Sequence, residues 1–476
     1  MIGNNIKEKI LTALLMIFGF LFLFYPTSDA LVNLRAVFAF LLILWGVKRI
    51  RTKIRLFHID EKYYVWIVVF FAVVTRVGVV LWLEPYMTQM SDFQRSIIAS
   101  KTLEFAGDYY RVFTHWILHP TIVNFIYRIF GESQLVALLF NALILIVAAV
   151  FIYKNASTLF GKKGYGLLAA LIYLFWPANI LYTLIFTQEH ICVLLLQVII
   201  YVFLKTESRE DCGINYKKNL MYITIGILLG VSLFFKNFTP VFMLAFCIYY
   251  VLKGITRAQL KKYFVYKFVA LMLIILSFSI TKNALFHVVD DLVGEKVARD
   301  ITACYLNVGL RGDGKYNAAN YNMYFETLLE NNYDYEKTNS QILEKLIREE
   351  KGNWSLDFFE KKAKTVVGGD SSRVLFVSES VKIGEHFRLA KILTDHVIDI
   401  NNNYFTVLVS LMALGLVYMI RQKDLNVFLL YLICFGGLLL LLLVEAQNRY
   451  MYAMQPIICI LAVLGIKFLK DTHSKK

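Results

Sequence analysis

The run LNVFLLYLICFGGLLLLLL, residues 425–443, decides the fold class of this protein. It holds 19 residues in a row without a charged side chain. A hydrocarbon core about 30 Å thick needs roughly 20 apolar residues in helical form. Lipid offers no hydrogen-bond partners to an unpaired backbone, so such a run must satisfy its own backbone groups. The run therefore predicts a membrane-spanning α-helix.

Similar apolar runs recur along almost the whole chain. Of its 476 residues 58% are hydrophobic and 18% charged, and the mean hydropathy is +0.58. This composition excludes an ordinary soluble domain, and continuous rather than alternating apolar runs exclude a barrel. We expect an all-α polytopic membrane protein with about twelve transmembrane helices. The predicted spans are 8–25, 31–47, 64–83, 134–153, 165–184, 188–204, 219–235, 238–252, 264–281, 403–420, 425–443 and 450–468.

Lysine and arginine residues concentrate on alternate connections between these spans. If the N-terminus is cytoplasmic, every short basic connection lies inside, as the positive-inside rule requires. This pattern accounts for the net charge of +15, so nucleic acid is not needed as a partner. We predict a multi-pass plasma-membrane protein with both termini in the cytoplasm. The basic residues concerned are Lys7, Lys9, Lys48, Arg49, Arg51, Lys53, Arg55, Lys162, Lys163, Lys217, Lys218, Lys261, Lys262, Arg421, Lys423, Lys470, Lys475 and Lys476.

The other polar regions all fall on the outer side in this topology. They are the loop 84–133, the corner 187–190, the connection 236–237, the segment 282–401 and the connection 445–450. The segment 282–401 is long enough to form a small extracytoplasmic subdomain that covers a site. Chemistry on the outer face is therefore the expectation.

Four regions of different character follow along the chain. The division is 1–63 for two additional N-terminal helices, 64–281 for a catalytic membrane core that includes the first outer loop 84–133, 282–401 for the extracytoplasmic subdomain, and 402–476 for the C-terminal helices. Helical periodicity outside the spans predicts an amphipathic surface helix at 121–130 and two helices at 341–350 and 356–367.

An ordered set of short motifs carries a family resemblance. In the first outer loop and the span before it, the motifs are Arg76, Asp92, Ala99, Gly107, His119-Pro120 and 130–133. This order resembles the first catalytic loop of GT-C type glycosyltransferases, the integral membrane enzymes that include protein O-mannosyltransferases and aminoarabinose transferases of the family 39 type. Similar motifs continue at Asn141, Tyr153, 160–163, 175–177, 187–189, 230–236 and 445–450. The resemblance covers roughly 64–260 well and the last two spans moderately.

The resemblance implies a GT-C type helical bundle, a sugar donor carried on a polyprenyl phosphate, and an acceptor that arrives from the outer side. A neutral acceptor hydroxyl attacks an anomeric carbon poorly, so the reaction needs a general base. Asp92 is the candidate for this base. The structural alternative is a solvated carboxylate that caps a helix.

The leaving group in such a reaction is an anionic phosphate, which calls for fixed cations at the outer surface. Lys236 and Arg449, the latter followed by Tyr450, lie on outer connections and are the candidates to bind the donor. The alternative is that both side chains snorkel to the headgroups. Arg76 lies within a span, where a charge is costly, so we expect it to have a carboxylate partner such as Asp92 and to orient it, or else to form a structural pair.

Further polar residues of the outer loops complete the predicted site. Glu189 is expected to contact the sugar or the acceptor, and Asp108, Arg111 and His119 are candidates for substrate binding. His119 has a scaffold role as its alternative. No Cys or His spacing indicates a metal site, and no cofactor is predicted with certainty. A divalent metal ion near the donor phosphate stays open, with ligands drawn from Asp92, Asp108, His115, His119, Glu189 and His190.

Two other functions remain as alternatives. A polymerase or ligase of lipid-linked cell-envelope glycan would share the large outer segment, and a secondary transporter would share the number of spans. Against a transporter stand the missing internal repeat and the long outer segment. The sequence leaves the sugar open, and the acceptor as lipid, protein or glycan. Its Lys-, Asn- and Ile-rich composition favours a bacterial membrane with an undecaprenyl carrier.

Overall fold

The computed structural model describes residues 60–208, 216–255 and 260–473, and within them every regular element is helical. The predicted spans 8–25 and 31–47 lie outside these ranges. By length and composition, seven helical segments of the described chain can cross a membrane. They are Glu61–Tyr86, Gln134–Phe160, Glu189–Glu207, Tyr263–Val293, Phe387–Gln422, Leu425–Leu443 and Asn448–Asp471. The prediction of an all-α membrane protein is confirmed for this part of the chain, whereas the predicted number of twelve spans is not.

One predicted span is interrupted. The run 165–184 forms two helices, α8 (Lys163–Leu174) and α9 (Pro177–Tyr182), with Trp176 between them in an extended conformation. Proline has no backbone N–H to donate, and its ring disfavours a helical conformation in the residue before it. The helix α8 has 12 residues and is about 18 Å long, too short to cross the hydrocarbon core. The prediction of one continuous span here was wrong, because Pro177 breaks the helix.

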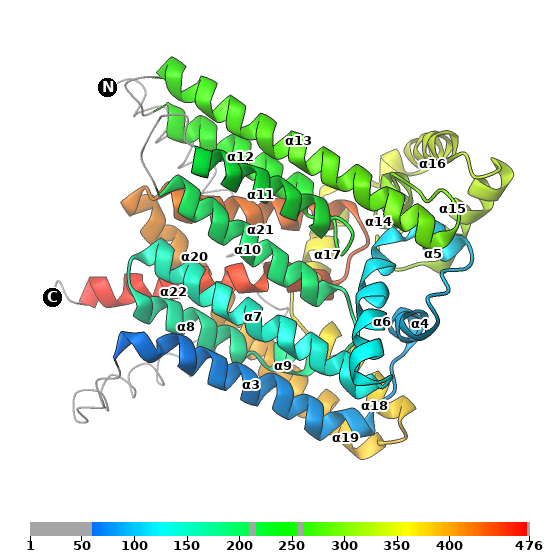
Figure 1. The fold of residues 1–476 in the computed structure, drawn as a ribbon, viewed down its shortest axis with the longest axis horizontal. Coiled ribbons are helices and arrows are strands. Elements are labelled where there is room, and N and C mark those ends of the chain that lie inside the picture. Colours follow the sequence, from blue (N-terminus) through cyan, green and yellow to red (C-terminus); the bar gives the residue numbers. More distant parts are fainter. Residues whose placement is uncertain (1–59, 209–215, 256–259, 474–476) are drawn as a thin grey trace.

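The long helices run along a common direction, so the molecule has two opposite ends. In Figure 1, α4 (Ser91–Thr102), α5 (Asp108–Val112) and α6 (Leu118–Phe130) gather at the right-hand end, and the C-terminus lies on the left. Three helices of the segment 282–401 gather at the same right-hand end: α14 (Thr302–Gly309), α15 (Ala318–Glu330) and α16 (Tyr335–Glu350). We call this the loop end. The helix α17 (Leu356–Val367) lies nearer the middle of the molecule, in contact with α21.

The helices predicted outside the spans are confirmed at α6, α16 and α17, and α17 has the predicted bounds. The helix α6 leaves Phe125, Ile129 and Phe130 exposed and buries its other face, as an amphipathic surface helix does.

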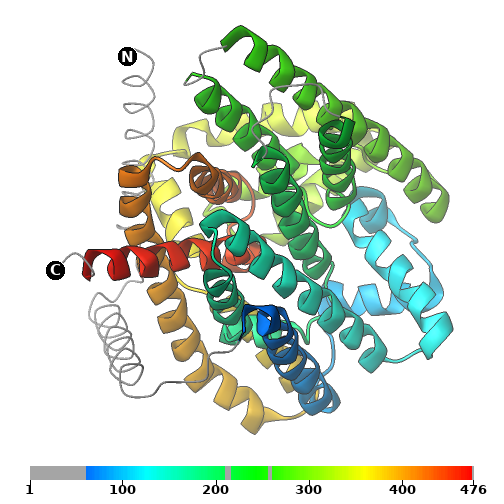
Figure 2. The ribbon, with the colours of Figure 1, turned by 60° about the vertical axis from the view of Figure 1, so that its left-hand side comes forward.

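Packing in the bundle joins segments far apart in the sequence. The helix α7 (Gln134–Phe160) lies against α3 (Tyr64–Leu83), α8 and α10 (Glu189–Glu207). Near the C-terminus, α20 (Ile398–Gln422) packs along α22 (Gln455–His473), while α21 (Leu425–Leu443) contacts α12 (Thr239–Gly254). Figure 2 shows α22 in red; this helix packs against α20 and also contacts α7 and α8. The core is therefore built from both halves of the chain.

The contact between α11 (Tyr216–Ser232) and α13 (Leu260–Val293) depends on two glycines one helical turn apart. A Cβ atom at Gly226 would collide with Ser277 and the α13 backbone, and one at Gly230 would press on Thr281. Small residues at this spacing let two membrane helices approach closely.

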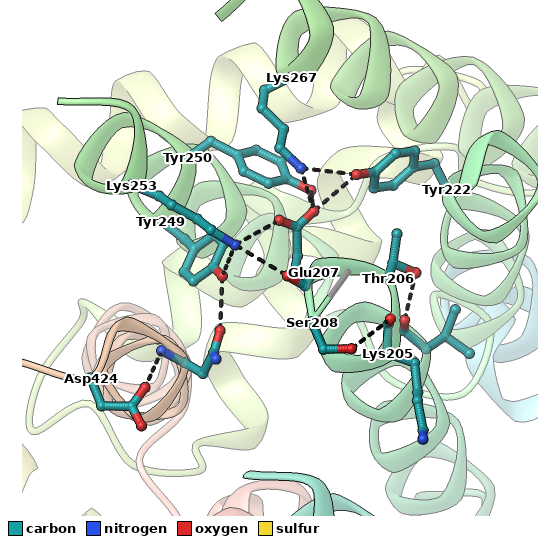
Figure 3. A network of polar contacts seen from close by, with 12 residues as sticks. Lys205, Thr206, Glu207, Ser208, Tyr222, Tyr249, Tyr250, Lys253, Lys267 and Asp424 are labelled. Carbon is teal, nitrogen blue, oxygen red and sulfur yellow. Dashed lines mark hydrogen bonds and ion pairs between the residues drawn. The ribbon is translucent and has the colours of Figure 1, made fainter. Parts of the chain in front are cut away.

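A buried ionic network lies far from the loop end (Figure 3). The Glu207 carboxylate accepts hydrogen bonds from Lys267 at 2.6 Å, Lys253 at 3.1 Å, Tyr222 at 2.9 Å and Tyr250 at 3.2 Å. These groups come from α10, α11, α12 and α13, so one carboxylate joins four helices. Glu207 is 18 residues from Glu189 along α10, about 27 Å away.

Candidate functional site

The centre of the candidate site is an ion pair between two connections of the bundle. Glu189 begins α10, and Lys236 lies between α11 and α12. The Lys236 Nζ atom is 2.6 Å from Glu189 Oε1, and the Tyr182 hydroxyl donates a hydrogen bond of 3.0 Å to Glu189 Oε2. Glu189 is only 6% exposed. A carboxylate this deeply buried is held by partners on both of its oxygens.

Arg449 and Tyr450 stand beside this pair. They belong to a short helix, Asn448–Met454, between α21 and α22. The Tyr450 ring centre is 4.0 Å from Lys236 Nζ, and the Arg449 guanidinium lies 5.0 Å from the same ring. Arg449 Nη2 is 3.4 Å from the Tyr450 hydroxyl, while its Nε is buried without a hydrogen-bond partner among the described residues.

Two cations and one carboxylate form this group. We call Lys236, Arg449 and Glu189 the cation cluster; its charges sum to an excess of one positive charge. His115 lies near the same charges and adds none, because burial and the Lys236 charge lower its pKa to about 3. An excess positive charge in a place largely screened from water favours an anionic ligand.

Asp92 lies on the second residue of α4 and is half-buried. Its neighbour is Tyr109, whose pKa is raised by burial and by the Asp92 carboxylate. The guanidinium of Arg95 lies 5.0 Å from the Tyr109 ring. Phe93, next to Asp92 in sequence, faces Arg449 at 5.7 Å from its guanidinium. The helix α4 thus reaches the cation cluster through Phe93.

Arg76 lies in another environment from the one expected. It is fully buried in α3, with its Nη2 atom 3.4 Å from the Tyr173 backbone oxygen and its guanidinium 5.4 Å from the Tyr173 ring. Its Nε and Nη1 atoms have no partner among the described residues. The expected pairing with Asp92 or another loop carboxylate is not found there, because Arg76 points into the bundle and not toward the loop.

Asp108 and Arg111 connect the first outer loop to the segment 282–401. Asp108 accepts a hydrogen bond of 2.7 Å from the Tyr333 hydroxyl, and it is 3.8 Å from Arg111. Arg111 pairs with Glu295 and lies 4.5 Å from the Tyr333 ring. Both side chains therefore have protein partners that hold two parts of the loop end together.

His119 is fully buried between two aromatic rings. Its ring centre is 4.4 Å from that of Phe186 and 6.5 Å from that of Phe140. Neither ring nitrogen has a hydrogen-bond partner among the described residues. Burial, followed by the charge of His190, lowers the pKa of His119 to about 3, so the ring is neutral. This packing matches the scaffold alternative.

The sequence reasoning missed several residues that organise the site. Tyr182 holds Glu189, and Tyr109 contacts Asp92. Glu445 is buried on the same connection as Arg449 and accepts hydrogen bonds from Gln447 and, at 2.8 Å, from Tyr321 on α15. Of these residues, only Tyr182 had a signal in the sequence. Pro177 predicts a helix break, and a turn of the chain there can bring Tyr182 near Glu189. The described residues contain no group of three or more His, Cys, Asp or Glu side chains arranged to hold a metal ion.

Comparison with known families agrees with the expected resemblance. A sequence profile of the dolichyl-phosphate-mannose-protein mannosyltransferase family matches residues 114–280. This region includes Glu189 and Lys236 but not Asp92 or Arg449. The match confirms the resemblance to GT-C type membrane glycosyltransferases. A search of curated proteins gave no match.

Solved structures of an archaeal oligosaccharyltransferase also match. One is AglB from Archaeoglobus fulgidus in complex with an inhibitory peptide and a dolichol-phosphate, at 12% identity and a TM-score of 0.48, covering 87% of this chain and 50% of that one. The apo form of the Archaeoglobus fulgidus enzyme matches at 12% identity and a TM-score of 0.48, covering 87% and 51%. The chain spans about half the length of these structures.

Proposed function

We propose that this protein is a glycosyltransferase that moves a sugar from a polyprenyl-phosphate donor to an acceptor hydroxyl on the extracytoplasmic face. The observation that carries the proposal is the excess positive charge of the cation cluster. Lys236 and Arg449 come from separate connections yet lie against the same Tyr450 ring. The family match over residues 114–280 supports this class of reaction.

The cation cluster binds the donor phosphate in this proposal. Arg449 has a buried Nε atom without a protein partner, and a phosphate oxygen would accept its hydrogen bond. Lys236 supplies a compact second charge, and Glu189 fixes the position of Lys236 while reducing the repulsion between the cations. The Tyr450 ring contacts both cations. As the bond to the sugar breaks, the growing charge on the phosphate is stabilised by both cations.

Asp92 acts as the general base. The acceptor oxygen forms a bond to the anomeric carbon while its proton passes to the Asp92 carboxylate. The bond between the anomeric carbon and the phosphate oxygen breaks, and its electron pair stays on the phosphate. The Phe93 contact with Arg449 supports this role, because it holds α4 beside the cation cluster, and Tyr109 lies next to the Asp92 carboxylate.

The loop end faces outward in this proposal. The helix α7 runs from the loop end and finishes at Phe160, so the basic pair Lys162 and Lys163 follows at the opposite end. Basic connections mark the cytoplasmic side. A bacterial plasma membrane, an undecaprenyl carrier and an acceptor of lipid, protein or glycan belong to the same proposal.

The donor experiment uses purified protein in lipid nanodiscs and a panel of polyprenyl-phosphate sugars. Transfer to membrane extracts from cells without the gene is followed with labelled donor. We expect one donor to be consumed with release of polyprenyl phosphate, and Lys236→Met and Arg449→Met to require more donor. Substitution of the exposed Lys361 to Met is the control. If no donor is consumed and sealed vesicles instead accumulate a labelled solute without donor, the protein is a transporter and the proposal is wrong.

A further inference from the structure

A buried ion pair from the segment 282–401 reaches into the membrane bundle. Asp370 lies at the turn before α18 (Ser372–Ile383) and Arg373 in its first turn, and neither is more than 1% exposed. Arg373 Nε is 3.1 Å from Asp370 Oδ1, and its Nη2 contacts the other carboxylate oxygen. The pair binds the helix break and α9, since Trp176 Nε1 donates to Asp370 at 2.9 Å and Arg373 Nη1 donates to Asn179.

These contacts hold α9, which cannot be stable by itself. It has six residues, far fewer than an isolated helix needs. Its first turn is held by Asn401, whose Oδ1 accepts from the Ala178 backbone N–H at 2.9 Å, and Asn401 donates in turn to the Asp370 carbonyl at 2.7 Å. The position of α9 is thus set by the Asp370 turn and by α20.

The last residue of α9 is Tyr182, which reaches the cation cluster. The Arg373 guanidinium lies 5.7 Å from the Tyr182 ring. The Tyr182 hydroxyl donates to Glu189, and Glu189 pairs with Lys236. A continuous series of contacts therefore runs from Arg373 to Lys236.

A second contact of the same segment reaches the other cation. Lys362 on α17 is buried and donates to the Val444 carbonyl at 2.8 Å and to the Gly309 carbonyl. The Ala446 N–H donates to the Gly314 carbonyl at 2.8 Å. These bonds fix the backbone a few residues before Arg449. The segment 282–401 thus supports both cations from two sides.

We propose that Arg373 is a positioning residue: through α9 and Tyr182 it holds Glu189 and Lys236 in place, so that docking of the segment 282–401 assembles the phosphate-binding site. The consequence for the donor rests on the proposed function, whereas the positioning itself does not. In the proposed function the segment 282–401 lies on the side from which the acceptor arrives. If this segment must dock before the donor phosphate is bound, binding of the acceptor and binding of the donor depend on each other.

The test measures the reactivity of the Lys236 amine in the full protein. Acetic anhydride is applied under limiting conditions, and acetylation is read by mass spectrometry, with exposed Lys361 as the internal reference. We expect Arg373→Gln to raise Lys236 acetylation by about fivefold, the change that corresponds to one lost hydrogen bond. Arg373→Lys keeps the charge but not the paired geometry, so its effect should be smaller. Trp176→Phe removes the N–H donor to Asp370 and part of the indole ring but keeps Arg373, and it serves if Arg373→Gln does not fold.

A matched control separates positioning from general destabilisation. Glu207→Gln breaks a buried ion pair at the far end of the same helix α10. It should lower the thermal midpoint while Lys236 acetylation stays at the wild-type level. Unchanged Lys236 acetylation in both folded Arg373→Gln and Trp176→Phe overturns the inference. Raised acetylation with an unchanged half-saturating concentration of polyprenyl phosphate upholds the positioning and overturns the phosphate role of Lys236.

Discussion

Lys236 and Glu189, 47 residues apart in sequence, form a 2.6 Å ion pair at the loop end of the bundle. The pair is almost completely buried on the Glu189 side, and Arg449 adds a second cation to it. A buried ion pair is weak evidence for stability, because desolvation of the two charges offsets much of their attraction. In the proposed function the pair positions Lys236 for an anionic ligand.

The two members of this pair should affect donor binding in opposite directions. In the proposed function Lys236 binds the donor phosphate, so Lys236→Met should weaken binding of a short-chain polyprenyl phosphate by about 10- to 100-fold, the range for a charged hydrogen bond. Glu189→Gln removes the opposing charge, so binding should be retained or become tighter. Ligand-induced shifts of the thermal midpoint measure both effects. Weaker binding in Glu189→Gln at an unchanged fold would show that the carboxylate itself contacts the ligand.

Asp92→Asn should separate chemistry from binding. The amide keeps the size of the side chain but cannot accept the acceptor proton, so transfer should fall by about 10²- to 10⁴-fold. Polyprenyl phosphate should still shift the thermal midpoint. Asp108→Asn is the matched control in the same loop, because Asp108 is engaged by Tyr333 and Arg111. A comparable loss in both variants would point to loop structure and not to a general base.

His119 should make the protein sensitive to acid. Its pKa is about 3 in the folded protein and about 6.5 in an unfolded chain, so the unfolded chain binds more protons between these values. Stability therefore rises with pH across this window and is lost as the pH falls below about 6.5. At pH 5 the loss is about 2 kcal/mol. His119→Leu should make the thermal midpoint less dependent on pH between 7 and 5, and His115, whose pKa is also lowered to about 3, should account for part of the dependence that remains. Substitution of the exposed His287 to Leu is the control.

The contact between α11 and α13 gives a matched pair of glycine substitutions. Gly226→Ala places a Cβ atom against Ser277 and the α13 backbone, which should destabilise the protein by about 1–3 kcal/mol. Gly78→Ala, in the helix α3, meets nothing within 4 Å and should be neutral or stabilising, because alanine favours a helix. Thermal midpoints measure both variants. Equal midpoints would mean that α13 moves away without cost.

Local patterns predicted the helices well where one physical constraint dominates. The apolar run at 425–443 forms α21 with the same bounds, because an unbroken apolar segment in lipid must satisfy its own backbone. The helix α17 also has the predicted bounds, with Ser355 as its N-cap. The prediction of one span at 165–184 was wrong because it followed the apolar character of the run and disregarded Pro177, which breaks the helix.

The candidate site was predictable only as a set of residue types on one side of the membrane. Topology brought Asp92, Glu189, Lys236 and Arg449 into consideration together, and the structure places the last three in one cluster. In the structure Arg76 contacts the backbone and the ring of Tyr173 and, among the described residues, no carboxylate. Asp108 and Arg111 have partners in the segment 282–401. Charge pairing depends on distances between connections, and these distances follow from how the helices pack.

The sequence by itself determined that this is a helical membrane protein with its polar residues gathered in a few connections, because apolar length and backbone hydrogen bonding act locally along the chain. Only the tertiary structure decided that Glu189 pairs with Lys236, that Arg449 joins them, and that Asp370 and Arg373 hold the broken helix behind them. These contacts depend on how segments up to hundreds of residues apart in sequence pack against each other. A small change in that packing lengthens the distance between two charged groups enough to break an ion pair.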